Sequence, residues 1–261
     1  MPNFGAATVE EVQPARCEAF AEALENAGQA SIDAFLNSNR HQVGFRVIGK
    51  GAIAQVLLEY ERNDIPKKSD DDWLDYLFKV MLDGVSSAEE FSEKNRVAFI
   101  TFNYDRLLET WLLRRIKYSF GLEDATAIEV LNRIPIRHVY GMLGPFSNSL
   151  NLDPRAWISA SKGIRTIFDT EHDQPTLDAC EALLSSAHTI CFLGFGYHRE
   201  NIELLNFVGH ARTCKGLVAS SRFDILDVEW ARLIRPFSGI KIHDSHPSYK
   251  CLASFRNLPI F

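Results

Sequence analysis

Residues suited to ligand chemistry follow three short runs of strand-forming residues in this sequence. In chain order they are Thr101, Asn103 and Asp105 at or just after the end of the first run, His138, Tyr140 and Gly141 at that of the second, and Gly194, Gly196, Tyr197, His198 and Asn201 at that of the third. In an open α/β sheet, ligands bind beyond the carboxyl ends of the strands. We therefore expect the three sets to line one cleft.

Asn103, Asp105 and His138 carry the most useful side chains of the first two sets. The Asn103 amide can donate and accept hydrogen bonds, although the residue could also serve only as a turn former. Asp105 stands at the start of a predicted helix, where helix capping and ligand contact are both open and can coexist. His138 could act as a general base near neutral pH, or it could be a core histidine satisfied by hydrogen bonds. It is expected on the same strand face as Tyr140, two residues later.

The third set lies in a turn with two glycines, between a predicted strand and a predicted helix that starts near Arg199. Glycine lets the backbone approach a ribose or phosphate closely, which favours a role for Gly194 and Gly196 in ligand binding. Many strand-to-helix turns use glycine for geometry alone, so that interpretation stays open as well.

The elements that must position these residues follow from hydrophobic periodicity. We predict strands at 96–102, 134–140, 189–193, 216–219 and 240–243. We predict helices at 14–28, 32–36, 49–62, 71–82, 104–118, 177–186 and 225–234. Strands alternating with helices predict an α/β fold with a parallel sheet covered on both faces. The expected organisation is a helical insertion or lid at 1–95 packed as one domain with a core at 96–261, with a long functional loop at 145–154.

Two predicted helices carry specific packing expectations. In the helix at 49–62, the residues Ile53, Val56, Leu57 and Tyr60 recur at helical spacing and are expected in the core. In the short helix that begins at Ile32, Ser31 is the expected N-cap.

Composition excludes several classes of protein. The chain has 261 residues and a formal net charge of -6, which does not provide the electrostatic footprint of a nucleic-acid binder. No apolar run approaches the roughly 20 residues of a membrane helix, and no signal peptide is visible at the start. The five cysteines contain no C-x-x-C pair, so we expect no metal site and a reducing, cytoplasmic location.

Three of these segments together resemble the bacterial sirtuin-like domains, several of which hydrolyse NAD in anti-phage defence. Thr101–Glu109 (TFNYDRLLE) resembles the family's T-x-N-Y-D-x-x-x-E motif. His138–Gly141 (HVYG) resembles its second motif, and Phe192–Tyr197 (FLGFGY) with Asn201 its third. Ser31–Leu36 (SIDAFL) is similar to a recurrent helical signature. The resemblance implies a Rossmann-like core and NAD as ligand or substrate.

The resemblance also implies roles for individual residues. Asn103 would contact the nicotinamide ribose and orient an attacking water, and Asp105 would support the nicotinamide amide or the loop. Our own hypothesis adds that His138, or a water that it positions, is the base. Further residues of the three sets would bind the cofactor: Thr101, Tyr140, Gly141, Gly194, Gly196, Tyr197 and Asn201. Such a site must position water and stabilise an oxocarbenium-like ribose.

Two features of the chain depart from the family pattern. Tyr140 stands where the family usually has a histidine before the glycine of its second motif. The strand and Gly-Ala-Gly loop with which such domains begin do not precede Val9. We therefore expect that Met1 is an internal or misassigned start and that the first glycine-loop strand is missing. An in-frame stop codon directly upstream of Met1 would contradict this expectation.

The sequence thus favours a sirtuin-like NAD glycohydrolase that produces nicotinamide and ADP-ribose. The alternative is a weakly active or inactive module that senses NAD or ADP-ribose and regulates a partner. A protein deacylase is less favoured, because the cysteines cannot form the four-cysteine zinc module that usually accompanies that activity. Expected partners are NAD and either a second copy of the chain or a defence-system protein, with no nucleic acid and no membrane.

Overall fold

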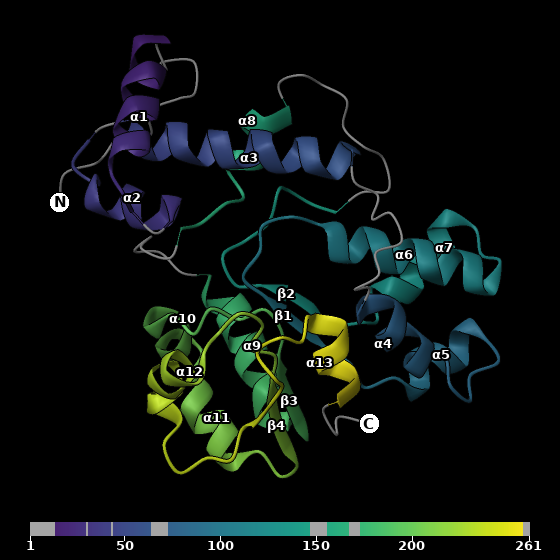
Figure 1. Cartoon of the computed structure of the whole chain (residues 1–261). Helices are drawn as coiled ribbons and strands as arrows, with labels where there is room; N and C mark the ends of the chain where they lie inside the picture. Colours follow the sequence, from purple (N-terminus) through teal and green to yellow (C-terminus); the bar gives the residue numbers. More distant parts are fainter. Residues whose placement is uncertain are drawn as a thin grey trace. The chain divides into compact units, whose positions relative to one another are not determined.

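The computed structural model describes residues 14–29, 31–42, 44–63, 73–146, 156–166 and 173–257. They form an α/β fold of Rossmann-like type, in which short parallel strands are flanked by helices (Figure 1). The fold class expected from the sequence is therefore confirmed. Residues 1–13 and 147–155, on which the missing strand and most of the long loop were predicted, lie outside the described residues.

Contacts divide the chain into two compact units whose segments alternate along the sequence. Unit 1 comprises Met1–Ile65, Thr101–Lys117 and His138–Asp173, and unit 2 comprises Pro66–Ile100, Tyr118–Arg137 and Gln174–Phe261. The division expected from the sequence, a helical region at 1–95 and a core at 96–261, stays a prediction.

Unit 1 begins with three helices that enclose a small aromatic core. They are α1 (Pro14–Asn26), α2 (Ile32–Ser38) and α3 (Phe45–Asn63). Phe20 and Phe35 are buried and pack with Phe45, with ring centroids 5.3 to 6.0 Å apart. The Ser31 side chain accepts a hydrogen bond of 3.2 Å from the Ala34 N–H, so the predicted cap of α2 is confirmed.

Helix α3 packs along α8 (Ala156–Ser161), and this contact confirms one part of the predicted core face of α3 and corrects the other (Figure 1). Val56 and Tyr60 are more than half exposed, whereas Ala54 and Leu58 are buried in the cluster with α8. A close approach explains the difference, because a Cβ on Gly51 would lie 2.9 Å from the Trp157 ring. Ile53 and Leu57 pack against the same cluster, as predicted, so the prediction is wrong only for Val56 and Tyr60.

Two strands lead into the residues predicted for the site. They are β1 (Phe99–Thr101) and β2 (Ile136–His138), which form a two-stranded sheet. The Phe99 N–H donates to the Pro135 carbonyl and the Val139 N–H to the Thr101 carbonyl, so pairing advances in the same direction along both strands. Helix α6 (Leu107–Phe120) follows β1. Both strands are shorter than predicted, and β2 ends before Tyr140.

Unit 2 contains a parallel sheet in the order β3 (Thr189–Phe192), β4 (Leu217–Ser220) and β5 (His243–Asp244). Its predicted helices are α4 (Trp73–Met81), α9 (Gln174–Ser186), α10 (Arg199–Leu204) and α12 (Asp227–Leu233). Short elements that we did not predict complete it: α5 (Ala88–Lys94), α7 (Asp124–Leu131), α11 (Phe207–Thr213), the 3-10 helix η2 (Arg235–Phe237) and α13 (Cys251–Asn257).

Two features of the fold differ from the sequence-based expectation. The described strands form two hydrogen-bonded sheets instead of one. The unpredicted helices of both units have at most eight residues, which is too short for a clear apolar stripe. Among the described helices, none combines the length and the apolarity needed to span a bilayer.

Candidate functional site

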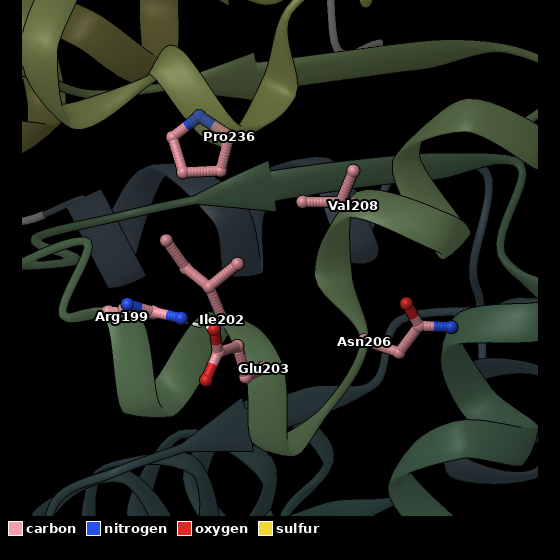
Figure 2. A pocket seen from close by; sticks show the side chains of 6 residues that line it. All are labelled: Arg199, Ile202, Glu203, Asn206, Val208 and Pro236. Carbon is pink, nitrogen blue, oxygen red and sulfur yellow. Dashed lines mark hydrogen bonds and ion pairs between the residues drawn. The ribbon is translucent and has the colours of Figure 1, made fainter.

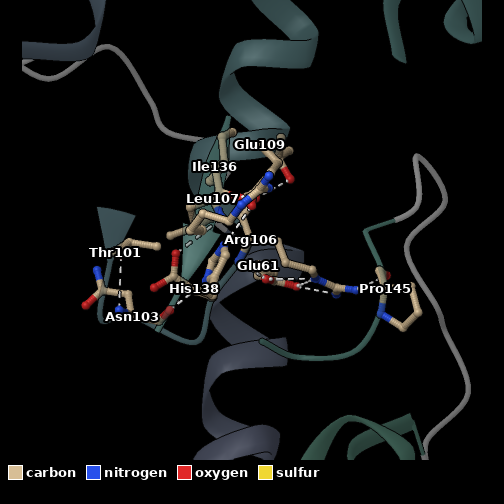
Figure 3. Close-up of polar contacts among 12 residues, drawn as sticks. Glu61, Thr101, Asn103, Arg106, Leu107, Glu109, Ile136, His138 and Pro145 are labelled. Carbon is tan, nitrogen blue, oxygen red and sulfur yellow. Dashed lines mark hydrogen bonds and ion pairs between the residues drawn. The ribbon is translucent and has the colours of Figure 1, made fainter. Parts of the chain in front are cut away.

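The backbone of Asn103 is held from both sides while its side chain is left exposed. Its N–H donates to Thr101 Oγ1 at 3.1 Å, and its carbonyl lies 2.7 Å from His138 Nδ1. The side chain is directed away from the His138 ring (Figure 3). Its amide makes no hydrogen bond to any residue that the structure describes. Asn103 therefore presents a free amide group on a fixed backbone at the end of β1.

His138 is a buried residue with a protein partner at each ring nitrogen. Besides Nδ1 and the Asn103 carbonyl, Nε2 lies 2.7 Å from Glu109 Oε1 in an ion pair whose side chains are 5% and 7% exposed. A carbonyl oxygen can only accept, so Nδ1 carries a proton. A second proton must lie between Nε2 and the carboxylate. The contacts fit either an imidazolium beside a carboxylate or a neutral imidazole beside a carboxylic acid, and the raised pKa of His138 favours the first.

The environment of His138 stabilises this charged form. Burial alone would lower the pKa of the imidazole. The hydrogen bond and negative charge of Glu109, the Asn103 carbonyl and the charge of Asp105 outweigh burial and raise the pKa of His138 above its ordinary value. The second oxygen of Glu109, Oε2, is buried without a hydrogen-bond partner among the described residues. Among the described residues, His138 is therefore the group that balances the negative charge of Glu109.

Asp105 caps the helix that follows the first motif. Its Oδ1 accepts a hydrogen bond of 3.2 Å from the Leu107 N–H at the start of α6. Burial raises the pKa of the Asp105 carboxyl, with a further contribution from the charge of Glu61, and outweighs the opposing effects of the Leu107 N–H and His138. The capping interpretation is thereby confirmed, and contact with a ligand stays a prediction.

Tyr140 and Gly141 occupy a tight turn after β2, so the expectation that His138 and Tyr140 share a strand face is wrong. Tyr140 is buried, with its ring 5.7 Å from that of Phe102, and its carbonyl accepts from the Arg165 N–H. Gly141 has φ +75°, and a Cβ there would overlap the Gly163 carbonyl. Geometry alone requires glycine at this position. Ligand contact by Tyr140 and Gly141 stays a prediction.

The third segment, in unit 2, is fixed by neutral groups. Gly194 has φ +58°, and its N–H donates to Ser221 Oγ at 2.9 Å. Tyr197 adopts φ +53°, an uncommon conformation for a residue with a side chain, and its hydroxyl donates to Ser220 Oγ at 2.7 Å. Burial raises the pKa of the Tyr197 phenol. Asn201 is buried in α10, and Gly196 lies against the His198 ring.

A pocket of about 280 Å³ lies beside this segment in unit 2 (Figure 2). It is lined by Arg199, Ile202, Glu203, Asn206, Val208 and Pro236. Arg199 and Glu203 form an exposed ion pair of 2.7 Å at its edge. None of the ten residues predicted for the site lines this pocket, although Asn201 belongs to the same helix.

The structure thus brings part of the predicted site together. Asn103, Asp105 and His138 belong to unit 1, with direct contact between Asn103 and His138. Gly194, Gly196, Tyr197 and Asn201 belong to unit 2, and the cleft shared by all three sets stays a prediction. No group of three or more potential metal ligands occurs within the part of the chain that the structure describes.

Sequence reasoning missed three charged residues beside Asn103. Glu109 closes the TFNYDRLLE segment, so its motif position was a usable signal. Arg106, inside the same segment, pairs with the buried Glu61 of α3. The pairing of Glu61 with Arg106 could not be predicted from the sequence, because the two residues are 45 positions apart.

Comparison with known families supports the importance of these segments. Residues 97–210 match the model of the SIR2-like domain family. The matched range is less than half of the chain, but it contains all ten residues predicted for the site. Searches of curated proteins and of solved structures each found no match. The resemblance to sirtuin-like domains is therefore supported for this range.

Proposed function

We propose that this chain binds NAD through its SIR2-like segment and hydrolyses it to nicotinamide and ADP-ribose. The observation that carries the proposal is the exposed amide of Asn103, whose backbone carbonyl is held by a buried, charged His138–Glu109 pair. A protein that only needed a turn at this position would gain little from burying two charges, because burial of ions is costly. Fixed support for an exposed polar side chain is what a ligand-binding role requires.

The proposed reaction breaks one bond of NAD and forms one bond to water. The bond between the nicotinamide nitrogen and ribose C1′ breaks, and its electron pair leaves with nicotinamide. Water forms the new C1′–O bond and releases one proton to solvent. Asn103 would hold a ribose hydroxyl or the attacking water, because an amide can donate and accept. An ionised Asp105 would favour the positive charge that develops on the ribose.

The geometry supports a positioning role for His138 within this proposal. A general base needs a ring nitrogen with a free lone pair, and both nitrogens of His138 are engaged by Asn103 and Glu109. We assign His138 to holding Asn103 in place. The expectation that His138 itself removes a proton stays a prediction and would require one of these two contacts to open.

The test is nicotinamide release from NAD by the full chain, followed by chromatography of both products. Asn103→Ala should abolish turnover and leave folding unchanged, because the side chain is exposed. Asn132→Ala, at an exposed asparagine that ends α7, is the matched control and should retain full activity. Equal turnover by the unchanged chain and the Asn103 variant would reject the proposal.

A sensing module is the second candidate, and the engaged nitrogens of His138 favour it. In that case NAD or ADP-ribose would bind near Asn103 without reaction and alter a partner protein. Calorimetric titration beside the turnover assay separates the two functions, since heat without product supports sensing.

Loss of cellular NAD on phage infection, in cells that express the chain, would support the anti-phage role that belongs to the first candidate.

A further inference from the structure

A second buried ion pair lies next to the Asn103 turn and joins it to helix α3. Arg106 Nη2 lies 2.6 Å from Glu61 Oε2, and Nε lies 3.2 Å from both carboxylate oxygens (Figure 3). The Glu61 side chain is 5% exposed and that of Arg106 is 14% exposed. This two-pronged geometry is the strongest form of an arginine–carboxylate contact.

Glu61 also holds the backbone of the same turn. Its Oε1 accepts a hydrogen bond of 2.6 Å from the Arg106 N–H, just ahead of α6. Arg106 reaches a third element through Nη1, which donates to the Pro145 carbonyl at 3.2 Å. One carboxylate therefore fixes both the main chain and the side chain of Arg106, and Arg106 connects α3 with the segment after β2.

The two ion pairs bracket the four residues from Asn103 to Arg106. His138 and Glu109 hold the carbonyl at the first residue, and Glu61 holds the N–H at the last. Between them, Asp105 caps α6, and the Tyr104 hydroxyl donates to the Arg165 carbonyl. A change at Glu61 would therefore alter the path of the chain that carries the Asn103 amide.

We infer that Glu61 and Arg106 are positioning residues that set the placement of the Asn103 side chain for its reaction with NAD. This inference rests on the proposed function. It makes helix α3 part of the site through Glu61, a residue that the sequence motifs did not indicate. A structural pair would only hold α3 in the fold, whereas a positioning pair also controls the turnover of the folded protein.

Kinetics of two conservative variants separate these roles. Glu61→Gln keeps the size of the side chain but places an NH₂ against the donors of Arg106, and Arg106→Lys keeps the charge but loses the two-pronged contact. We expect kcat to fall about 100-fold for Glu61→Gln and less for Arg106→Lys, with little change in KM, because misplacement near 1 Å has an effect of this size. The matched controls are Glu59→Gln on α3 and Arg114→Lys on α6, both exposed. They should keep the original kcat.

Active enzyme is counted by the folded fraction in each sample, measured by circular dichroism. If both variants keep the original kcat per folded molecule, the positioning role is overturned even when their melting temperatures fall. If Glu61→Gln does not fold, Arg106→Lys alone decides, since it preserves the charge and the backbone contact.

Hydrogen exchange keeps this test independent of NAD hydrolysis. If the unchanged chain releases no nicotinamide, the proposed function fails. The rate of amide hydrogen exchange in residues 101–109 then shows whether Glu61 holds the turn that carries Asn103. We then expect at least tenfold faster exchange of the Arg106 amide in Glu61→Gln than in Glu59→Gln. Equal exchange rates in these two variants would overturn the inference.

Discussion

The turn after β1 and the turn after β3 are fixed by different kinds of interaction. In unit 1, the residues from Asn103 to Arg106 are held by two buried ion pairs, His138–Glu109 and Glu61–Arg106. In unit 2, the turn from Gly194 to Tyr197 is held by the hydroxyl groups of Ser220 and Ser221 and by contacts among aromatic rings. Burying a charge is costly, and the contribution of a buried charge to stability changes with pH. The hydroxyl groups of unit 2 are neutral, so their contribution to stability does not change in this way.

This difference bears on the proposed role of Asn103. A neutral network is sufficient to fix a turn, as unit 2 demonstrates. The buried charges around Asn103 therefore support the proposed function, because the burial of ions is costly for a turn that neutral groups could hold.

The largest effect should come from removing one partner of a buried pair. Glu109→Ala leaves the His138 imidazole buried without its counter-charge, and we expect the free energy of unfolding to fall by about 3 kcal/mol or more. Urea denaturation at neutral pH measures it. Glu129→Ala, at an exposed position of α7, is the control and should change stability by less than about 0.5 kcal/mol. A loss below about 1 kcal/mol at Glu109 would contradict the charged state assigned to the pair.

A smaller effect is expected from pH. The raised pKa of His138 means that the folded state binds its proton more tightly than the unfolded state. The stabilising contribution is full below the ordinary histidine pKa of about 6.5 and is lost as the pH rises through the raised value. At its steepest the loss is about 1.4 kcal/mol per pH unit.

Urea denaturation from pH 6 upward tests this, and His138→Gln should remove the dependence. The raised pKa of Asp105 lowers stability as the pH rises from its ordinary value of 3.8, and comparison with His138→Gln, which keeps Asp105, separates the two effects. Stability that is flat from pH 6 to the alkaline limit of folding would argue against a protonated His138.

The smallest effect should come from the neutral network of unit 2. Tyr197→Phe removes the hydrogen bond from the phenol to Ser220 Oγ, while Ser220 keeps its bond to the Ser221 carbonyl. We expect a loss of about 1 kcal/mol that does not vary between pH 6 and 9. The same urea measurement at several pH values checks this. A loss that changes with pH would mean that the two turns do not differ as proposed.

Much of the fold was predictable because its signals are local. Ser31 caps α2 through a residue three positions away, and the runs after Arg96 and Ile134 form strands because of their own composition. The short helices such as α8 could not be predicted in this way. They form because a larger surface covers them, as α3 covers Ala156 and Ala160.

The candidate site divides along the same line. Local sequence patterns were enough to assign Asn103, Asp105 and Glu109 to one segment and His138 to the next predicted strand. The folded structure was needed to see that both ring nitrogens of His138 are engaged and that Glu61, from a distant helix, holds Arg106. Residue spacing determines which side chains share a face, but the partners of a buried charge come from other parts of the chain that folding brings near.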